Sequence, residues 1–249
     1  KYGIPTSQGA GIFVFMGKET RRFFGLLHVK RQPGGREAIK SGGGDRMAER
    51  LILIRHGDLG NRCRGRYIGR TDAPLSAEGR RQAAALAGRL VRLPDGASLL
   101  VSPLRRTRET AELALGRGTN FAVDSDLREI DFGRWEGMGF AEILAADPAA
   151  VDRWAALAED FAFPDGESIG HFRKRIGAAA GRIAADPAET AVVITHGGVI
   201  RFLICHFLGL PDRAHLLFDV QPASISEIRI DGGKGVLTLL NERRHLEMG

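Results

Sequence analysis

Two histidines that end short apolar runs are the residues with the clearest chemical potential in this 249-residue sequence. His56 follows LILIR and precedes Gly57, and His196 follows AVVIT and precedes Gly197. Short, fully apolar runs are typical of strands buried on both faces of a parallel sheet. Because open α/β sheets bind ligands at the carboxyl ends of their strands, we expect the two imidazoles to meet at one sheet edge.

Arginines accompany these histidines. Arg55 adjoins His56, and a third apolar run ends at Ser102 and leads into a helix whose first turn carries Arg105 and Arg106. Guanidinium groups bind phosphate through two parallel hydrogen bonds, and helix N-termini add oriented backbone amides. Two arginines and two histidines at one edge therefore indicate a phosphoryl pocket, whereas arginines outside it are expected to be solvated surface charges.

The chemistry of such a pocket follows from what the sequence contains. It has no His, Asp or Glu set at metal-ligand spacing, no HExxH and no Walker-type glycine loop, so we expect neither a metal nor another cofactor. Fixed cations must then neutralise the phosphoryl oxygens. A neutral imidazole can attack phosphorus and form a phosphohistidine, and the leaving alkoxide needs a proton from a nearby acid. The Gly197 amide, at the start of the helix after His196, is a further candidate phosphate donor.

The elements that position these residues alternate between strand and helix. This alternation predicts an α/β fold with a mostly parallel sheet, and a hairpin signal near the end of the chain predicts an antiparallel edge. Strands are expected at 51–54, 98–102, 121–123, 191–195, 225–230 and 236–240, and helices at 76–92, 103–115, 140–146, 148–158, 169–185 and 198–208.

Charge divides the chain in two. Residues 1–46 hold nine Lys or Arg against three acidic residues, which accounts for the whole net charge of +6. We interpret residues 1–46 as a basic, glycine-containing extension, expected to be disordered, and residues 47–249 as one neutral domain. A neutral domain excludes a nucleic-acid-binding body, and no apolar run is long enough to predict stable membrane insertion. The two cysteines, Cys63 and Cys205, are too few for a disulfide framework and favour a cytoplasmic protein.

Five motifs in order resemble the histidine phosphatase superfamily, also called phosphoglycerate mutase-like. They are LIRHG, VSPLRRTRETA, LREIDFGRWEG, PDGES and VVITHGGVIR, and the resemblance extends from about Glu49 to the end of the chain. It implies a three-layer α/β/α fold and a metal-independent phosphomonoester hydrolase that acts on a small phosphorylated metabolite. The oligomeric state does not follow from it.

The resemblance also implies roles for particular residues. His56 is the expected nucleophile, His196 the second catalytic imidazole, and Glu129 the acid that later serves as base toward water. Arg55 and Arg106 are the expected phosphate ligands, with Arg105 a neighbour of the pocket. Asp131 and Glu136 are rival carboxylates close to Glu129 in the same motif.

One position departs from the family pattern. Many members carry Asn six residues after the nucleophile, where this chain has Arg62 preceded by Asn61. Either Asn61 fills that role or Arg62 supplies a longer cationic arm to the phosphate.

The loops narrow the expected activity. The short spacing between Arg106 and Glu129 lacks the insertion of the mutases, and YIGRTDAPL, FPDGES and QPASISEI are similar to α-ribazole phosphatases. These act on α-ribazole 5′-phosphate in cobalamin synthesis. A broad-specificity phosphatase, a phosphoglycerate mutase and a non-catalytic phosphate-binding module remain as alternatives.

Overall fold

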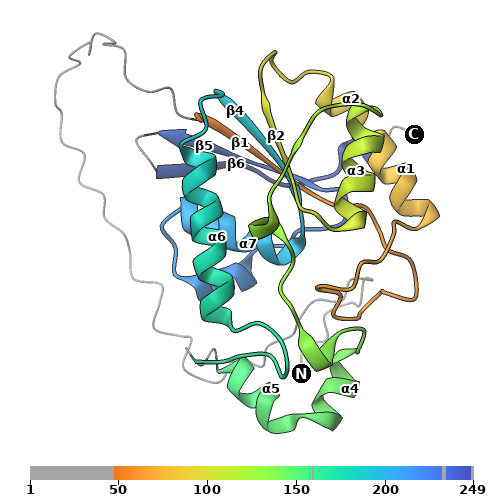
Figure 1. The fold of residues 1–249 in the computed structure, drawn as a ribbon, viewed down its shortest axis with the longest axis vertical. Coiled ribbons are helices and arrows are strands. Elements are labelled where there is room, and N and C mark those ends of the chain that lie inside the picture. The colour runs from red at the N-terminus through yellow and green to blue at the C-terminus, as the bar shows by residue number, and fades with distance from the viewer. Residues whose placement is uncertain (1–47, 157, 159, 232–233, 248–249) are drawn as a thin grey trace, which may run out of the picture. The chain divides into compact units, whose positions relative to one another are not determined.

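The computed structural model describes residues 48–156, 158, 160–231 and 234–247, and the expected extension at 1–46 lies outside them. The described part is built on a six-stranded sheet with the order β3-β2-β4-β1-β5-β6 (Figure 1). Its strands are β1 (Arg50–Arg55), β2 (Ser98–Val101), β3 (Ala122–Val123), β4 (Thr190–Thr195), β5 (Ile225–Asp231) and β6 (Lys234–Glu242). The first four are parallel, whereas β5 and β6 form an antiparallel edge, which confirms the predicted sheet.

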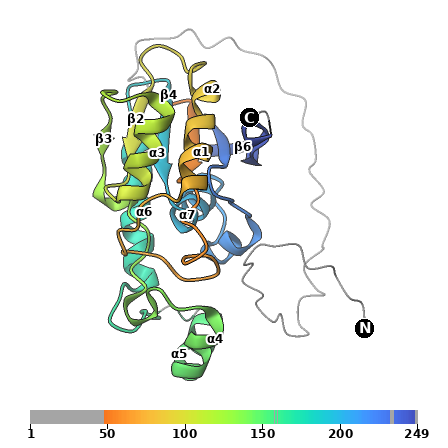
Figure 2. The same ribbon diagram turned by 90° about the vertical axis from the view of Figure 1, so that its right-hand side faces the viewer.

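Helices cover both faces of this sheet (Figures 1 and 2). The covering helices are α1 (Ala77–Ala85), α2 (Ala87–Leu90), α3 (Arg105–Leu115), α6 (Ile169–Ala184) and α7 (Gly197–Phe207). Two further helices, α4 (Phe140–Ala146) and α5 (Pro148–Ala155), lie away from the sheet at the bottom of Figure 1. Leu51 and Leu53 belong to the same apolar cluster as residues of α6 and α7. Ile52 and Ile54 belong to a second cluster with Leu86, which lies between α1 and α2, and with residues of α2 and α3. Successive strand residues point to opposite faces, so one apolar strand serves both cores. The layers are α/β/α, as expected.

Hydroxyl side chains begin two of the helices. The Ser76 side chain accepts a hydrogen bond from the Gly79 amide at 2.9 Å, and Ser168 accepts one from His171 at 3.0 Å. The helix predicted at 76–92 differs in one respect, because it breaks at Leu86. There the backbone N–H bonds to the Ala83 carbonyl at 3.3 Å, a tighter 3₁₀-type contact.

Strand register decides which residues share an edge. Arg55 pairs with Thr195, and Val101 pairs with Ile194. The residues that follow these strands, His56, His196 and Ser102, must therefore emerge side by side.

An aromatic cluster packs the segment between β3 and α6. Trp135 is fully buried and makes edge contacts with Trp154 and Phe163, with ring centroids 5.8 and 5.4 Å away. Its indole N–H donates to Asp147 at 2.9 Å. Helices α4 and α5 belong to this segment, which lies beyond the carboxyl ends of the parallel strands (Figure 1). The cluster anchors the irregular loop that precedes Trp135. Within the described residues, no helix has the length and apolarity needed to cross a membrane.

Candidate active site

His56 follows β1, its ring is buried, and one of its ring nitrogens makes a hydrogen bond to the main chain. Its Nδ1 lies 2.8 Å from the Gly57 carbonyl oxygen, which can only accept, so Nδ1 carries the proton. Nε2 is then the unprotonated nitrogen of the neutral ring. Burial, together with the charges of Arg106 and Arg55, holds the pKa of His56 well below 6.5. The ring is therefore neutral at pH 7, which is the nucleophilic form.

His196 lies beside it at the end of β4. The two ring centroids are 5.3 Å apart, and His196 is fully buried. Arg106 Nε donates to His196 Nδ1 at 3.2 Å, which leaves the proton on Nε2 to donate to Ser102 Oγ at 2.7 Å. Burial and the Arg106 charge hold the pKa of His196 well below 6.5 as well.

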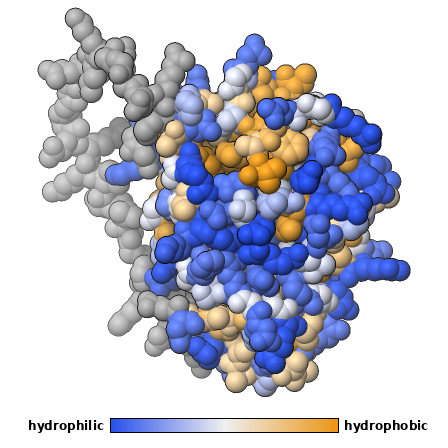
Figure 3. All heavy atoms as spheres, in the orientation of Figure 1, coloured by the Kyte–Doolittle hydropathy of each residue, from blue (hydrophilic) through white to orange (hydrophobic). Residues whose placement is uncertain are grey.

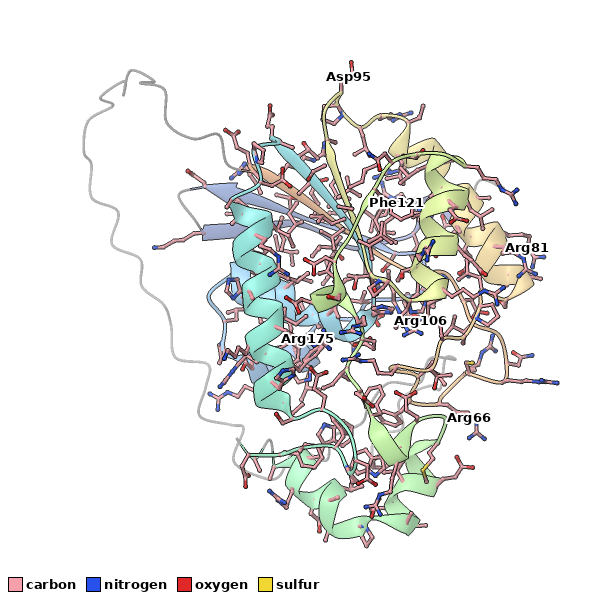
Figure 4. The ribbon with its side chains drawn as sticks, in the orientation of Figure 1. Arg66, Arg81, Asp95, Arg106, Phe121 and Arg175 are labelled. Carbon is pink, nitrogen blue, oxygen red and sulfur yellow. The ribbon has the colours of Figure 1, made fainter. Side chains whose placement is uncertain are left out.

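The structure separates the two arginines at the start of α3. Arg106 is fully buried and, besides His196, donates to the carbonyl oxygens of Gly69 at 2.7 Å and Thr71 at 2.8 Å. Arg105 instead faces solvent and pairs with Glu109 at 2.6 Å. Burial lowers the pKa of Arg106, but a guanidinium still carries its charge at pH 7. Arg106, which Figure 4 shows at the start of α3, is thus the arginine held beside the two histidines.

Arg55 is a second arginine whose position is fixed by a hydrogen bond to the main chain. One of its terminal nitrogens donates to the Val220 carbonyl at 2.6 Å, while its buried Nε has no hydrogen-bond partner. Burial and the neighbouring Arg201 lower the pKa of Arg55 to about 10, so it is charged at pH 7. A Cβ placed at Gly197 would lie 3.4 Å from the Arg55 guanidinium carbon, so the start of α7 packs directly against this cation. An orphaned donor at this position is suited to an anionic ligand.

Glu129 reaches the same place from its loop. The carboxylate accepts hydrogen bonds from the Gly198 amide at 3.0 Å and from the Ile130 amide at 3.1 Å. Its rivals are occupied elsewhere. Asp131 accepts from the Gly133 amide at 2.9 Å, and Glu136 accepts from the Gly69, Arg70 and Thr71 amides. Both rivals shape loops, whereas Glu129 adjoins the helix that begins after His196.

The structure brings together Arg55, His56, Arg106, Glu129 and His196, and Gly197 adjoins them as the first residue of α7. Asn61 and Arg62 are exposed, and no hydrogen bond involves either side chain in the described contacts. Their predicted contact with phosphate stays a prediction. The face in Figure 3 shows a broad hydrophilic band at the level where the strands end, which is a surface that a charged ligand can approach.

Sequence reasoning gave no role to Ser102, which orients His196, or to Thr110, whose hydroxyl accepts from the Gly57 amide at 3.2 Å. The only signal for Ser102 was its place at a third strand end. Among the described residues, no group of three or more His, Cys, Asp or Glu is arranged to hold a metal ion. Two cations, two neutral imidazoles and a carboxylate can bind and transfer a phosphoryl group.

The described residues form a three-layer α/β fold in which two arginines, two buried histidines and a buried carboxylate lie together at one edge of the sheet. The family model for branch 1 of the histidine phosphatase superfamily matches residues 51–243. The chain belongs to the histidine phosphatase superfamily, which confirms the family predicted from the five motifs.

Individual relatives carry different names. The bifunctional protein Rv2228c of Mycobacterium tuberculosis is 36% identical over 79% of this chain, which spans only 55% of that protein. Phosphoserine phosphatase 1 of Hydrogenobacter thermophilus is 31% identical over 79% of this chain and 94% of its own length. The crystal structure of the α-ribazole phosphatase from Shigella flexneri aligns with a TM-score of 0.71 and 28% identity, covering 78% of this chain and 96% of that one.

Proposed function

We propose that this chain is a phosphomonoester hydrolase that works through a phosphohistidine on His56. The observation that carries the proposal is the state of the His56 ring: neutral, with Nδ1 on a carbonyl and Nε2 unprotonated, near the charges of buried Arg106 and part-buried Arg55. A nucleophile and its charge-neutralising partners are thereby positioned before substrate binds.

In the first half-reaction, Arg55 and Arg106 bind the phosphoryl oxygens, and the Gly197 amide adds a donor. His56 Nε2 attacks phosphorus as the ester P–O bond breaks, and Glu129 gives its proton to the leaving alkoxide oxygen. In the second, the Glu129 carboxylate takes a proton from water while the water oxygen attacks phosphorus and the P–N bond breaks. Inorganic phosphate leaves, and His56 is again neutral.

His196 acts in this scheme by holding Arg106 while Ser102 fixes its own ring. The neutral ring is the form that holds Arg106, because a proton on Nδ1 would remove the acceptor of the Arg106 Nε–H. Asn61 or Arg62 completes the phosphate contacts from the loop after β1.

The substrate is a small phosphorylated metabolite, and α-ribazole 5′-phosphate is the first candidate because of the loop motifs. The names of the relatives also support phosphoserine, so a broad-specificity phosphatase is the second candidate. The mutase alternative lacks support, since the chain passes from α3 through β3 to the Glu129 loop without an added domain. The two free cysteines suit a reducing compartment such as the cytoplasm.

The test is hydrolysis of p-nitrophenyl phosphate in EDTA by the wild type, His56→Ala and Glu129→Ala. We expect wild-type turnover and a loss of at least about 10³-fold in His56→Ala. Rapid acid-free quenching with labelled substrate should trap an alkali-stable phosphoprotein in the wild type and not in His56→Ala. Full activity in His56→Ala would overturn the mechanism, and a silent wild type would favour a phosphate-binding module.

A panel of substrates then distinguishes the candidate enzyme activities. It contains α-ribazole 5′-phosphate, phosphoserine and 3-phosphoglycerate, compared by kcat/KM. A strong preference for α-ribazole 5′-phosphate supports the first candidate, and similar values support broad specificity. Isomerisation of 3-phosphoglycerate primed by the bisphosphate would restore the mutase.

A further inference from the structure

Arg175 projects from α6 (Figure 4) and is buried. Its guanidinium donates to one loop and to one carboxylate. Two of its nitrogens donate to the two oxygens of Glu167, at 2.7 and 2.8 Å. The third nitrogen, Nη1, donates to the main-chain carbonyls of Asp126 and, at 2.6 Å, Arg128 in the loop that carries the acid. Nη2, which also binds Glu167, donates to the carbonyl of Glu129 itself at 3.2 Å. One side chain thus grips three carbonyls within four residues of chain.

Glu167 belongs to the PDGES turn, for which the reaction scheme has no use. Its side chain is 5% exposed, and besides Arg175 it accepts hydrogen bonds from His171 at 2.8 Å and the Asp131 amide at 3.4 Å. Burial alone would raise the pKa of Glu167, but the hydrogen bonds from Arg175 and His171 outweigh burial and lower it. Glu167 is therefore ionised at pH 7 and balances the buried Arg175 charge.

The backbone joins the same two segments. The Glu167 amide donates to the Asp131 carbonyl at 2.9 Å, and the Arg134 amide donates to the Pro164 carbonyl at 2.8 Å. The approach is so close that a Cβ on Gly133 would lie 2.1 Å from the Pro164 oxygen. The PDGES turn is thus docked directly onto the loop that presents Glu129.

This docking is needed because no helix or strand includes residues 128–132. Among the residues that the structure describes, the Glu129 carboxylate hydrogen-bonds to the two amides named above and to no other group. Displacement of a catalytic group by about 1 Å costs on the order of 10²-fold in rate.

We propose that Arg175 and Glu167 are positioning residues that fix the loop of Glu129, so that its carboxyl reaches the leaving-group oxygen. The proposal rests on the proposed function, because it assumes that Glu129 is the general acid. Neither residue touches the substrate, and the pair acts only through the main chain of residues 126–131.

Leaving-group dependence tests this role. p-Nitrophenolate leaves as a stable anion and needs little protonation, whereas an alkoxide such as that from glycerol 2-phosphate requires the acid. The parameter kcat/KM is measured for both esters, since it reports steps through formation of the phosphoenzyme. In Arg175→Lys and Glu167→Gln we expect kcat/KM for glycerol 2-phosphate to fall at least tenfold more than that for p-nitrophenyl phosphate.

Two further variants serve as the positive and the negative control for this selective loss. Glu129→Gln should show the same selective loss, and Arg173→Lys, an exposed arginine on the same helix that pairs with Asp212, should show none. If Glu129→Gln is selective while both positioning variants lower the two esters equally, or lower neither, the positioning role is wrong and the acid stands. If Glu129→Gln is not selective, the assigned acid itself is wrong.

Thermal unfolding of each variant separates a displaced loop from a lost fold. Glu167→Gln keeps the shape and part of the hydrogen bonding, so it serves if Arg175→Lys does not fold. A folded Glu167→Gln with wild-type selectivity would overturn the proposal.

Discussion

The Glu129 carboxylate lies directly against the backbone of Gly198. The Gly198 amide donates to one carboxylate oxygen at 3.0 Å, and a Cβ built on Gly198 would lie 2.5 Å from the other. Only a residue without a side chain lets the proposed acid approach the start of α7 so closely. Gly198, the second glycine of THGG, therefore contributes to the site because its missing side chain leaves room for the Glu129 carboxylate.

Gly198→Ala should displace Glu129 while leaving the fold intact, since alanine favours the helix that begins here. A shift of about 1 Å should lower kcat/KM for glycerol 2-phosphate by roughly a hundredfold. Gly88→Ala is the matched control, because a Cβ there would meet nothing within 4 Å. Equal activity of the two variants would show that the carboxylate can move without cost.

The buried imidazoles predict a loss of stability in acid. His56 and His196 have pKa values well below 6.5 in the folded chain, whereas both return to about 6.5 on unfolding. Above pH 6.5 neither state binds these protons. Below pH 6.5 only the unfolded state does, so the free energy of unfolding falls by up to about 1.4 kcal/mol per pH unit for each histidine.

Urea unfolding of the wild type and His56→Asn between pH 8 and pH 5 measures this effect. The two free energies should run parallel above pH 6.5, and the wild type should fall more steeply below it. Parallel curves over the whole range would mean that His56 takes up its proton at the same pH in the folded and in the unfolded chain.

The two adjacent arginines of α3 should respond very differently to lysine. Arg106→Lys cannot keep the contacts with Gly69, Thr71 and His196 together, and loss of a preorganised donor should lower kcat/KM by about 10²- to 10³-fold. Arg105→Lys alters a surface ion pair worth at most about 1 kcal/mol to the fold and should leave turnover within about twofold of wild type. A reversed order would place the phosphate on the other side of the helix.

The inhibition constant of inorganic phosphate tests whether Asn61 or Arg62, in the loop after His56, contacts phosphate. Because Asn61 and Arg62 are exposed, we expect Asn61→Ala and Arg62→Ala each to raise the inhibition constant less than about fivefold, the scale of an exposed charge contact. A much larger rise for one of them would show that the loop closes over bound phosphate, and would identify which residue makes the contact.

The order of apolar runs and of the polar residues that end them was sufficient to predict the parallel sheet and the edge that carries His56 and His196, whereas the family followed from the resemblance of five motifs. These features are local: burial on both faces demands an unbroken apolar strand, and a polar residue after it falls at the strand end. The five motifs added Arg106 and Glu129, and the structure brings both to that edge. They did not explain PDGES, and they did not show why Gly198 must be glycine.

Those points depend on contacts between segments far apart in the chain. The structure decided that Arg106 turns inward and Arg105 outward, because only the first faces the carbonyls of residues 69 and 71. It decided that Glu136 holds a loop while Glu129 meets α7, and that Arg175 grips the chain around Glu129. Hydrogen-bond partners depend on how segments pack in three dimensions, so residue type and spacing alone could name the groups at the site but not their partners.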